Sequence, residues 1–372
     1  MTEKKNDLPH VCVIGLRGFP GVQGGVEKHC EALYPRMEGF RFTVYRRKPY
    51  LAADAPKQWN GIEFVDLPST RIKGFEALFH TFIATLSAIR RRPDIIHIHN
   101  IGPGLFSPLI KLFGIKVVTT YHSANYEHKK WGAFARALLR FGERMTLRFS
   151  DRIIFVNQSK YLAQPQQIRD KSTLILNGVV PAVPSEKTDY IESIGLKKGE
   201  YLLGVGRLTP EKGFEYLIRA ANLSPQISAV AIAGGADHDE EYLESLRSFD
   251  TNGKVVFTGN LQGESLRQLY THARAFVLSS VTEGFPLVLL EAMSYGLPVL
   301  VSDIDAVKPL LAASPDGFIP QEAVFRSADP DALREAIRRL TDGEIPSRQW
   351  PMDRFDWSAI ASQTASLFHS II

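Results

Sequence analysis

Short apolar runs alternate with longer amphipathic stretches along the whole chain. The runs are rich in Val and Ile, as in VCVI at 11–14 and PVLVS at 298–302, and such runs are typical of buried strands. Between them, apolar residues recur at helical spacing, for example over 75–90 and 131–149. This alternation of strands and helices predicts mainly parallel sheets with helices on both faces.

The expected strands form two groups, separated by a proline-bearing polar segment near residue 182 that is typical of a linker. They span 10–14, 41–46, 62–67, 94–99, 116–121, 152–156 and 173–176, and then 201–205, 229–233, 254–258, 275–278, 298–302 and 323–326. We therefore predict an α/β fold of two doubly wound parallel-sheet domains that face a cleft. Ligands of such sheets bind at the carboxyl ends of the strands.

The composition sets the class of protein. The 372 residues, with 44% hydrophobic and 23% charged side chains, suffice for two globular domains. No apolar run reaches the length that spans a bilayer, and the first ten residues lack the apolar stretch of a signal peptide. The two cysteines, Cys12 and Cys30, are too few for a disulfide framework or a zinc site. These features predict a cytoplasmic protein.

The charge is divided unevenly between the two halves. Residues 1–181 carry 27 Lys and Arg against 14 Asp and Glu, a net charge of +13, whereas residues 182–372 carry 17 against 26, a net charge of −9. The basic half suggests an anionic partner. Because the sequence has no nucleic-acid motif, we expect an anionic membrane surface or a diphosphate-bearing acceptor. The alternative is that the opposite charges help the two domains to close on each other.

The stretch 283–291, EGFPLVLLE, is the most informative segment of the chain. Pro286 suits the first position of a helix, so Glu283 should lie in the preceding loop and Glu291 in the second helical turn. Glu291 stands in an apolar run, where a carboxylate needs hydrogen-bond donors. The free amides of a helix start bind anions. Amides for a phosphate and carboxylates for hydroxyl groups together favour binding of a nucleotide sugar.

Two glycine-bearing turns follow expected strands. The turn at 206–213 holds Arg207 and Lys212, two cations that suit a diphosphate. The loop at 15–27 is rich in glycine and leads into a helix that begins near Val26. A dinucleotide-binding oxidoreductase is an alternative, but the glycine spacing does not match GxGxxG. The arginines that end the next strand, at 46 and 47, suit at best a 2′-phosphate.

Several further side chains are candidates for chemistry. His122 ends a strand, and His97 and His99 share one face of another strand, although no third metal ligand is evident beside them. Asp-x-Asp pairs at 237–239 and 303–305 could hold a metal on a diphosphate, but the cationic turn makes a metal redundant, so we predict none. The Asn-Gly turn at 177–178 favours a structural role.

The expected helix at 131–149 carries a basic stripe. The stripe consists of Arg136, Arg140, Arg144 and Arg148, and the apolar residues assigned to the opposite face are Phe134, Leu138, Phe141 and Met145. Such a helix usually has one core face and one solvated face. With the basic residues at 129–130 and 90–92, it also fits contact with anionic lipid headgroups.

Four strings, in order along the chain, resemble motifs of the retaining GT4-type glycosyltransferases of the GT-B fold. They are GGVE at 24–27, YHS at 121–123, GRLTPEKG at 206–213 and EGFPLVLLEAMSYGLPVL at 283–300. The resemblance covers nearly the whole chain. A weaker resemblance, over 18–75 and 126–131, is to rhamnosyltransferases of polysaccharide biosynthesis.

The resemblance implies an acceptor-binding Rossmann-like domain at 1–181, a nucleotide-sugar-binding one at 182–355, and a tail helix at 356–372 that crosses back to the first domain. The implied catalytic residues are His122, Arg207, Lys212 and Glu283. The implied donor-binding residues are Gly24, Gly25, Gly206, Gly284, Phe285, Leu287, Val288 and Glu291. Glu283 would bind sugar hydroxyls and Glu291 the ribose.

The implied activity is retaining transfer of a hexosyl or deoxyhexosyl group from a nucleoside-diphosphate sugar to a glycan or lipid-diphosphate-linked acceptor in cell-surface polysaccharide synthesis. No cofactor and no side-chain general base are implied, since the leaving phosphate can take the acceptor proton. Two alternatives remain. A sugar-nucleotide epimerase or a non-catalytic nucleotide-sugar binder would have the same fold.

Overall fold

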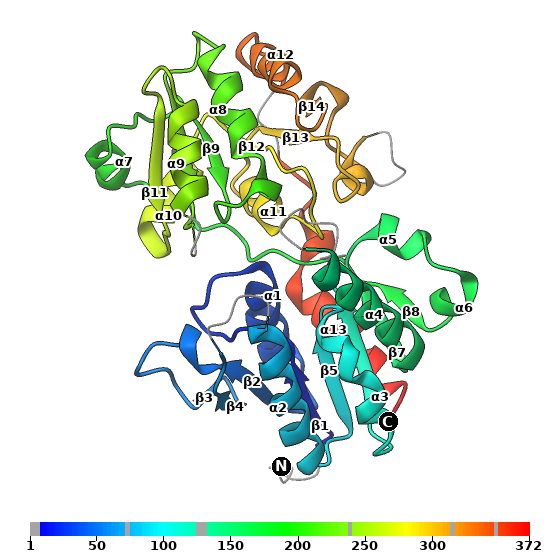
Figure 1. The fold of residues 1–372 in the computed structure, drawn as a ribbon. Helices are drawn as coiled ribbons and strands as arrows, with labels where there is room; N and C mark the ends of the chain where they lie inside the picture. Colours follow the sequence, from blue (N-terminus) through cyan, green and yellow to red (C-terminus); the bar gives the residue numbers. More distant parts are fainter. Residues whose placement is uncertain (1–7, 71–74, 124–131, 237–239, 313–316, 346–348) are drawn as a thin grey trace. The chain divides into compact units, whose positions relative to one another are not determined.

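The computed structural model describes residues 8–70, 75–123, 132–236, 240–312, 317–345 and 349–372. The chain divides into two compact units, one of residues 1–178 with 355–372 and the other of residues 179–354. We call these the first and the second domain (Figure 1). The segment at 126–131 with Lys129 and Lys130, and the pair Asp237 and Asp239, lie outside the described residues.

The first domain is built on an eight-stranded sheet in the order β3-β4-β2-β1-β5-β6-β7-β8. Its strands are β1 His10–Ile14, β2 Arg41–Arg47, β3 Gln58–Trp59, β4 Ile62–Leu67, β5 Ile95–His99, β6 Lys116–Tyr121, β7 Arg152–Phe155 and β8 Ser172–Leu174. All pairs are parallel except β3 with β4. Sequence analysis missed β3, because two residues are too short to show an alternating pattern.

The second domain has a six-stranded sheet, wholly parallel, in the order β11-β10-β9-β12-β13-β14. Its strands are β9 Tyr201–Val205, β10 Ala229–Ala233, β11 Val255–Gly259, β12 Ala275–Leu278, β13 Val299–Ser302 and β14 Val324–Phe325. The predicted α/β class with two parallel-sheet domains is confirmed.

Helices cover both sheets. They are α1 Gly25–Leu33, α2 Glu76–Arg90, α3 Ser107–Lys111, α4 Ala133–Phe149, α5 Gln158–Leu162, α6 Gln166–Arg169, α7 Asp189–Ser193, α8 Phe214–Asn222, α9 Glu240–Phe249, α10 Gly263–His272, α11 Leu287–Ser294, α12 Pro330–Thr341 and α13 Trp357–His369. The last helix, α13, belongs to the first domain, where it packs against α1.

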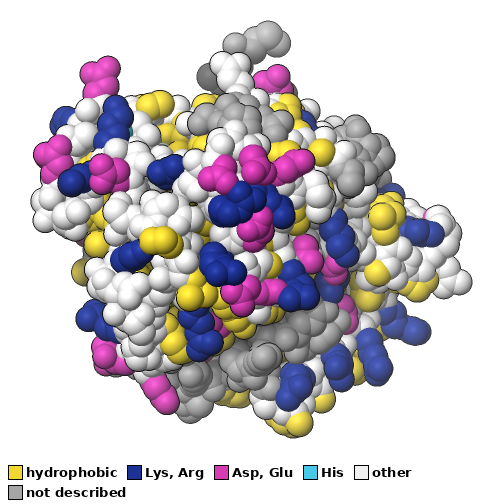
Figure 2. All heavy atoms as spheres, turned by 90° about the horizontal axis from the view of Figure 1, so that it is seen from above, with side chains coloured by type: hydrophobic (Ala, Val, Ile, Leu, Met, Phe, Trp, Pro, Cys, Tyr) yellow, Lys and Arg dark blue, Asp and Glu magenta, His cyan; other side chains and the backbone are white. Residues whose placement is uncertain are grey.

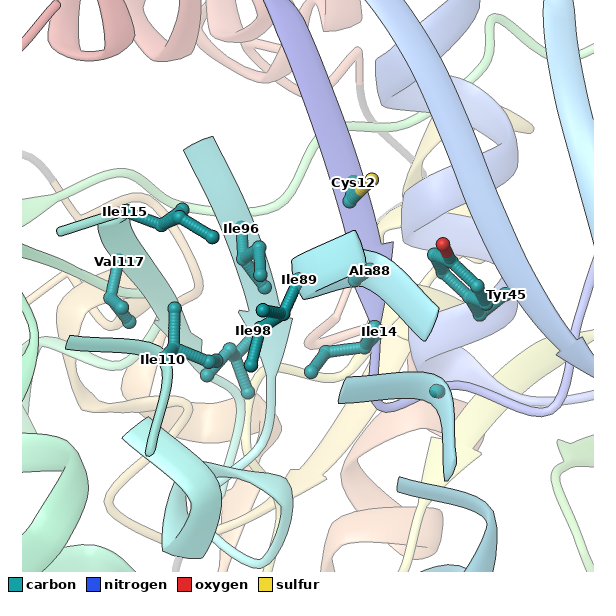
Figure 3. Close-up of a cluster of buried hydrophobic side chains, with 11 residues drawn as sticks. Cys12, Ile14, Tyr45, Ala88, Ile89, Ile96, Ile98, Ile110, Ile115 and Val117 are labelled. Atoms are coloured by element: carbon teal, nitrogen blue, oxygen red, sulfur yellow. The ribbon is translucent and has the colours of Figure 1, made fainter. Parts of the chain in front are cut away.

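The core of the first domain lies on either side of its sheet. On one face, Ala88 and Ile89 of α2 pack against Ile14 of β1 and Ile96 and Ile98 of β5 (Figure 3). Each fully buried Ile contributes roughly 1.5–3 kcal/mol to folding. This face is therefore held mainly by apolar side chains, with Cys12 and Tyr45 as the members of the cluster that carry a polar group.

One predicted helix start is wrong by a residue. Pro286 has extended backbone angles, φ −79° and ψ 92°, and is the N-cap of α11, which begins at Leu287. The capping position needs non-helical angles, and the φ that proline allows fits them as well as it fits the first helical turn. Glu291 still lies in the second turn, and Glu283 in the loop before the helix.

Candidate active site

The carboxyl ends of β9 and β12, neighbours in the second sheet, bring a cation and a carboxylate together. Lys212 follows β9, and Glu283 follows β12. The Lys212 Nζ atom lies 2.5 Å from Glu283 Oε1, and the Ser280 hydroxyl donates to the same oxygen at 2.7 Å. The two charged side chains are 18% and 11% exposed. The pair is therefore desolvated on most sides but open on one.

The backbone around this pair is fixed by a close approach of two loops. Gly213 has φ 61°, in the left-handed region, and a Cβ atom there would lie 2.3 Å from the carbonyl oxygen of Ser279. The Ser279 hydroxyl donates in turn to the carbonyl of Lys212 at 2.9 Å. Only glycine fits this contact. Gly213 therefore fixes the backbone position of the neighbouring Lys212.

The site has unused hydrogen-bonding groups. Among the described residues, neither the two other N–H groups of Lys212 nor Glu283 Oε2 have a hydrogen-bond partner. The same holds for the N–H groups of Leu287 and Val288, which begin α11. Free helix-start amides and an ammonium group bind an anion, and a carboxylate oxygen accepts from hydroxyl groups.

The other predicted residues of the second domain lie in or near these loops. Arg207 is one-third exposed and lies 3.9 Å from Glu211. Phe285 is buried, 6% exposed. Glu291 finds the donor that its apolar setting requires, since the hydroxyl of Tyr270 donates to Glu291 Oε2 at 2.9 Å. Sequence analysis missed Ser279, Ser280 and Tyr270, although a serine pair directly after a buried strand was a usable signal.

In the first domain, the glycine-rich loop after β1 is held by an acidic side chain of α1. The Glu27 carboxylate accepts from the backbone N–H of Arg17 at 2.9 Å. Gly24 has φ 151°, and a Cβ atom there would lie 2.0 Å from Glu27 Oε2. Gly25 is the first residue of α1, with open space where a side chain would be. The loop thus leaves its backbone accessible at Gly25.

The alternative of a 2′-phosphate site on β2 is wrong. Arg46 is fully buried, and its Nε donates to Asp66 at 2.7 Å. Arg47 pairs with Glu76 at 3.2 Å. Both guanidinium groups are therefore engaged inside the domain, which removes the anchor that an NADP-dependent oxidoreductase would need.

His122 lies in a cluster of buried imidazoles. Its Nε2 atom is 2.9 Å from His99 Nδ1, and the ring of His29 stands 4.9 Å from it, nearly perpendicular. His29 Nδ1 lies 2.8 Å from the Asn177 side-chain oxygen, which gives this turn residue a contact across the fold. Burial lowers the pKa of His29 to about 4 and that of His97 to about 3. It also lowers the pKa of His99 and His122 well below the usual value.

These imidazoles correct one expectation from the sequence. A group of three potential ligands does exist, although it includes His99 and not His97, because atoms of His29, His99 and His122 lie within 4.8 Å of one another. The 2.9 Å separation of His99 and His122 is nevertheless that of a hydrogen bond, shorter than the spacing of two nitrogens on one metal ion. The absence of a metal stays a prediction.

The described Asp-x-Asp pair is also engaged. Asp303 Oδ1 accepts from the backbone of Ser327 at 2.7 Å, and Asp305 pairs with Lys308 at 2.6 Å. Among the described residues, these aspartates form no group of three potential metal ligands. Their geometry is that of loop-fixing carboxylates.

Two family models match the chain. The model described as "Glycosyltransferase Family 4" matches residues 23–183, and "Glycosyl transferases group 1" matches residues 186–351. The first match contains the strands of the first domain from β2 to β8 but not β1, and the second contains all six strands of the second domain.

Relatives and solved structures agree with the models. The UDP-Gal:alpha-D-GlcNAc-diphosphoundecaprenol alpha-1,3-galactosyltransferase of Escherichia coli is 30% identical over 277 residues, 69% of this chain and 68% of the relative. An uncharacterised glycosyltransferase of Methanocaldococcus jannaschii is 32% identical over 216 residues, 54% of each chain, so that match spans about half of the relative. The structure of sucrose-phosphate synthase from Thermosynechococcus elongatus superposes with a TM-score of 0.79, at 23% identity, over 97% of this chain and 98% of that one.

The rhamnosyltransferase resemblance is not addressed by these matches and stays a prediction. The two family models and the Escherichia coli relative are sufficient for the family, and the solved structure for the fold. The chain belongs to the GT4-type glycosyltransferases and has the GT-B fold.

Proposed function

We propose that this glycosyltransferase uses a nucleoside-diphosphate sugar and transfers the sugar, with retention of its anomeric configuration, to a glycan or lipid-diphosphate-linked acceptor in cell-surface polysaccharide synthesis. The observation that carries the proposal is the Lys212–Glu283 pair, with its unused N–H and carboxylate groups beside the free amides of α11. The name of the Escherichia coli relative supports both substrates, since it specifies a UDP-sugar and a lipid diphosphate.

The chemistry follows from where charge develops. As the bond between the anomeric carbon and the phosphate oxygen breaks, negative charge grows on the diphosphate, and Lys212 and Arg207 oppose it. Each key donor of this kind contributes roughly 3–4 kcal/mol to the transition state. The acceptor oxygen bonds to the carbon on the same face, and its proton passes to the leaving phosphate. Glu283 binds hydroxyl groups of the sugar, and Glu291 binds the ribose. His122 lies beside the anomeric carbon.

The first test is a thermal-shift screen of the purified protein against UDP, GDP, dTDP, ADP and NADP. A ligand at a hundredfold excess over its Kd stabilises the folded state by about 2.7 kcal/mol. Stabilisation by one nucleoside diphosphate supports the proposal and identifies the donor class. Stabilisation by NADP alone, or by no compound, would contradict it.

Two substitutions then test the site. Arg207→Ala and Glu283→Ala should each reduce turnover at least a hundredfold. Arg334→Ala, which removes a half-exposed arginine of α12, is the matched control and should retain turnover. Near-normal rates in Arg207→Ala or Glu283→Ala would overturn the assignment of these residues.

Incubation with the donor alone separates the rival functions. A transferase hydrolyses the sugar nucleotide slowly, an epimerase converts the sugar, and a non-catalytic binder does neither. We further propose that the protein's own cations and amides hold the diphosphate without a metal ion. Turnover should then be unchanged by a chelator such as EDTA.

The exposed side of α4 supports binding of the protein to the anionic inner surface of the membrane. The four arginines of the stripe are exposed. The apolar face assigned from the sequence is partly wrong, because Phe134 and Phe141 are 84% and 48% exposed, whereas Leu138 and Met145 are half-buried. Arginines interleaved with exposed aromatic rings are typical of helices that lie in a membrane interface. The described residues contain no helix that is both long and apolar enough to cross a membrane.

The charge elsewhere on the surface is more mixed. In the view of Figure 2, acidic and basic side chains are intermingled over the centre of the face, and several Lys and Arg side chains follow its lower right edge. Many exposed charges of the second domain are paired on one helix, as Arg338 is with Glu335 and Asp342. The exposed arginines and aromatic rings of α4 therefore differ from the paired charges around Arg338.

Vesicle sedimentation tests the membrane contact. The protein should bind vesicles that contain anionic phospholipid more strongly than vesicles of neutral lipid, and less so at high salt. Arg136→Glu with Arg140→Glu should abolish the difference, whereas Arg334→Glu with Arg338→Glu, the same charge change on α12, should preserve it. Equal binding of both double variants would contradict a role for α4.

A further inference from the structure

A continuous chain of hydrogen-bonding groups runs from His122 into the core of the first domain. His122 Nε2 lies 2.9 Å from His99 Nδ1, and His99 Nε2 lies 2.6 Å from the hydroxyl of Tyr34. That hydroxyl is 2.8 Å from His97 Nδ1, and His97 Nε2 is 2.8 Å from Thr120 Oγ1. Four consecutive contacts therefore join five side chains from β5, β6, their flanking residues and the turn after α1. We call these five side chains the relay.

The relay is shielded from water. His97, His99 and Thr120 are fully buried, Tyr34 is 1% exposed, and His122 keeps 7% of its surface. Phe368 of α13 covers His97, with the two rings perpendicular and 5.1 Å apart. Cys30 Sγ, a weak hydrogen-bonding group, lies 3.5 Å from His99 Nε2 and shields this side of the imidazole from water. Water cannot therefore exchange freely into the inner part of the relay.

The proton positions in such a relay are coupled. Burial keeps the three imidazoles neutral, so each has one N–H and one bare nitrogen. If the Thr120 hydroxyl donates to His97, then His97 donates to Tyr34, Tyr34 to His99, and His99 to His122. If His122 Nε2 carries the proton, every donor and acceptor is reversed. The tautomer of one imidazole therefore sets the tautomers of the others.

The outer end of the relay is His122 Nδ1. Among the described residues, His122 Nδ1 has no hydrogen-bond partner. In the first proton order, Nδ1 carries a proton and donates, and in the reversed order it is bare and accepts. The Thr120 hydroxyl, at the far end, favours the first order whenever it donates to His97.

We propose that Thr120, His97, Tyr34 and His99 are positioning residues that fix the ring orientation and the tautomer of His122, and thereby decide whether Nδ1 offers a donor or an acceptor to the sugar of the donor substrate. The proposal rests on the proposed function, since it assigns His122 to the reaction centre. It adds that the hydrogen-bonding character of His122 is set four contacts away.

The decisive comparison uses two neighbouring threonines of β6. Thr120→Val removes the terminal hydroxyl of the relay. Thr119→Val makes the same change in the next residue, on the opposite face of the strand, where the fully buried hydroxyl bonds Ser150 at 2.8 Å and lies outside the relay. Both variants lose one buried hydrogen bond, so a purely structural effect should be similar in the two.

The measurements are imidazole nitrogen NMR shifts, which distinguish the tautomers, together with kcat and KM for the sugar nucleotide. Thr120→Val should change the tautomer populations of His122 and reduce kcat about tenfold, as expected for one misdirected hydrogen bond. Thr119→Val should leave the tautomers and kcat unchanged. The proposal would be overturned if the His122 nitrogen shifts were the same in Thr120→Val, Thr119→Val and the unmodified protein.

A second pair covers the case in which Thr120→Val fails to fold. Tyr34→Phe cuts the middle of the relay. Tyr45→Phe also removes the hydroxyl of a fully buried tyrosine in the same domain, in the apolar core on α2 and outside the relay. Only Tyr34→Phe should alter the His122 tautomer and kcat. If both variants behave alike, the relay does not act on His122.

The NMR results test the relay, and the kinetic results test the proposed function, so each proposal can fail without the other. A tautomer change in Thr120→Val, with no transfer or donor hydrolysis by the unmodified protein, would leave the relay standing and remove the proposed function. Normal turnover by the unmodified protein, with no tautomer change in Thr120→Val or Tyr34→Phe, would support the proposed function and remove the relay.

Discussion

Acidification should destabilise the first domain through its buried histidines. Six histidines of this domain are each at most 7% exposed, and burial lowers the pKa of every one of them. They are His10, His29, His80, His97, His99 and His122. In the unfolded chain they regain a pKa of about 6.5. The unfolded state therefore binds more protons below that pH. The stabilising contribution is fully present above about pH 6.5 and is lost as the pH falls toward the lowered pKa values.

The size of the effect follows from the unfolded state. Between pH 7.5 and pH 5.5, a histidine with an unfolded pKa of about 6.5 and a much lower folded pKa loses about 1.4 kcal/mol of stability. Six such residues give about 8 kcal/mol, which is comparable to the whole stability of many domains. The result depends little on the folded values, provided that these remain about 4 or below.

The assay is urea unfolding followed by circular dichroism at several pH values between 5.5 and 7.5. The free energy of unfolding should fall by about 8 kcal/mol over this range. His97→Gln removes one of the six titrating groups and should reduce the slope by about a sixth. Gln363→Ala, at an exposed position on α13, removes no titrating group and should leave the slope unchanged. A fall of less than about 1 kcal/mol would refute the inference that these imidazoles are neutral in the folded state.

Two further predictions concern packing and charge in the same domain. Gly142→Ala should destabilise by about 1–3 kcal/mol, because the new Cβ atom would lie 2.6 Å from the carbonyl of Ile101. Gly132→Ala should not, since no atom of the described residues lies within 4 Å of its new Cβ atom. Thermal melting measures both. Asp66→Ala should cost about 3–5 kcal/mol, because it leaves the fully buried Arg46 without its carboxylate. Retention of the wild-type melting temperature by Asp66→Ala would show that the guanidinium finds other partners.

Much of the fold was predictable because its strands are short apolar runs bounded by glycine, proline or charge. The predicted segments at 10–14, 62–67, 116–121, 201–205, 229–233 and 275–278 match the observed strands residue for residue. The loops that carry Lys212 and Glu283 follow two of these strands, β9 and β12. Because parallel strands present their carboxyl ends at one edge, the strand pattern alone is enough to place this pair at the same edge of the sheet.

The partners of the site residues were less predictable. His29 contacts Asn177 across 148 positions of the chain, and Tyr34 joins two histidines more than 60 residues away. Local periodicity carries no information about such contacts, since it reports only which face of an element is buried. A usable signal was present in α1, where His29 and Cys30 occupy positions that the structure buries. A polar residue at a buried helical position needs a partner.

The acid sensitivity and the relay share three buried imidazoles, those of His97, His99 and His122, but they can be separated by experiment. Apolar side chains in these positions would avoid the loss of stability at low pH, so packing alone does not account for the histidines. Thr120→Val removes no titrating group, and it should therefore change the His122 tautomer without changing the pH dependence of unfolding. His97→Gln should change both. If Thr120→Val altered the pH dependence but not the tautomer, the hydroxyl would act on the burial of the cluster, and the relay would have no role in orienting His122.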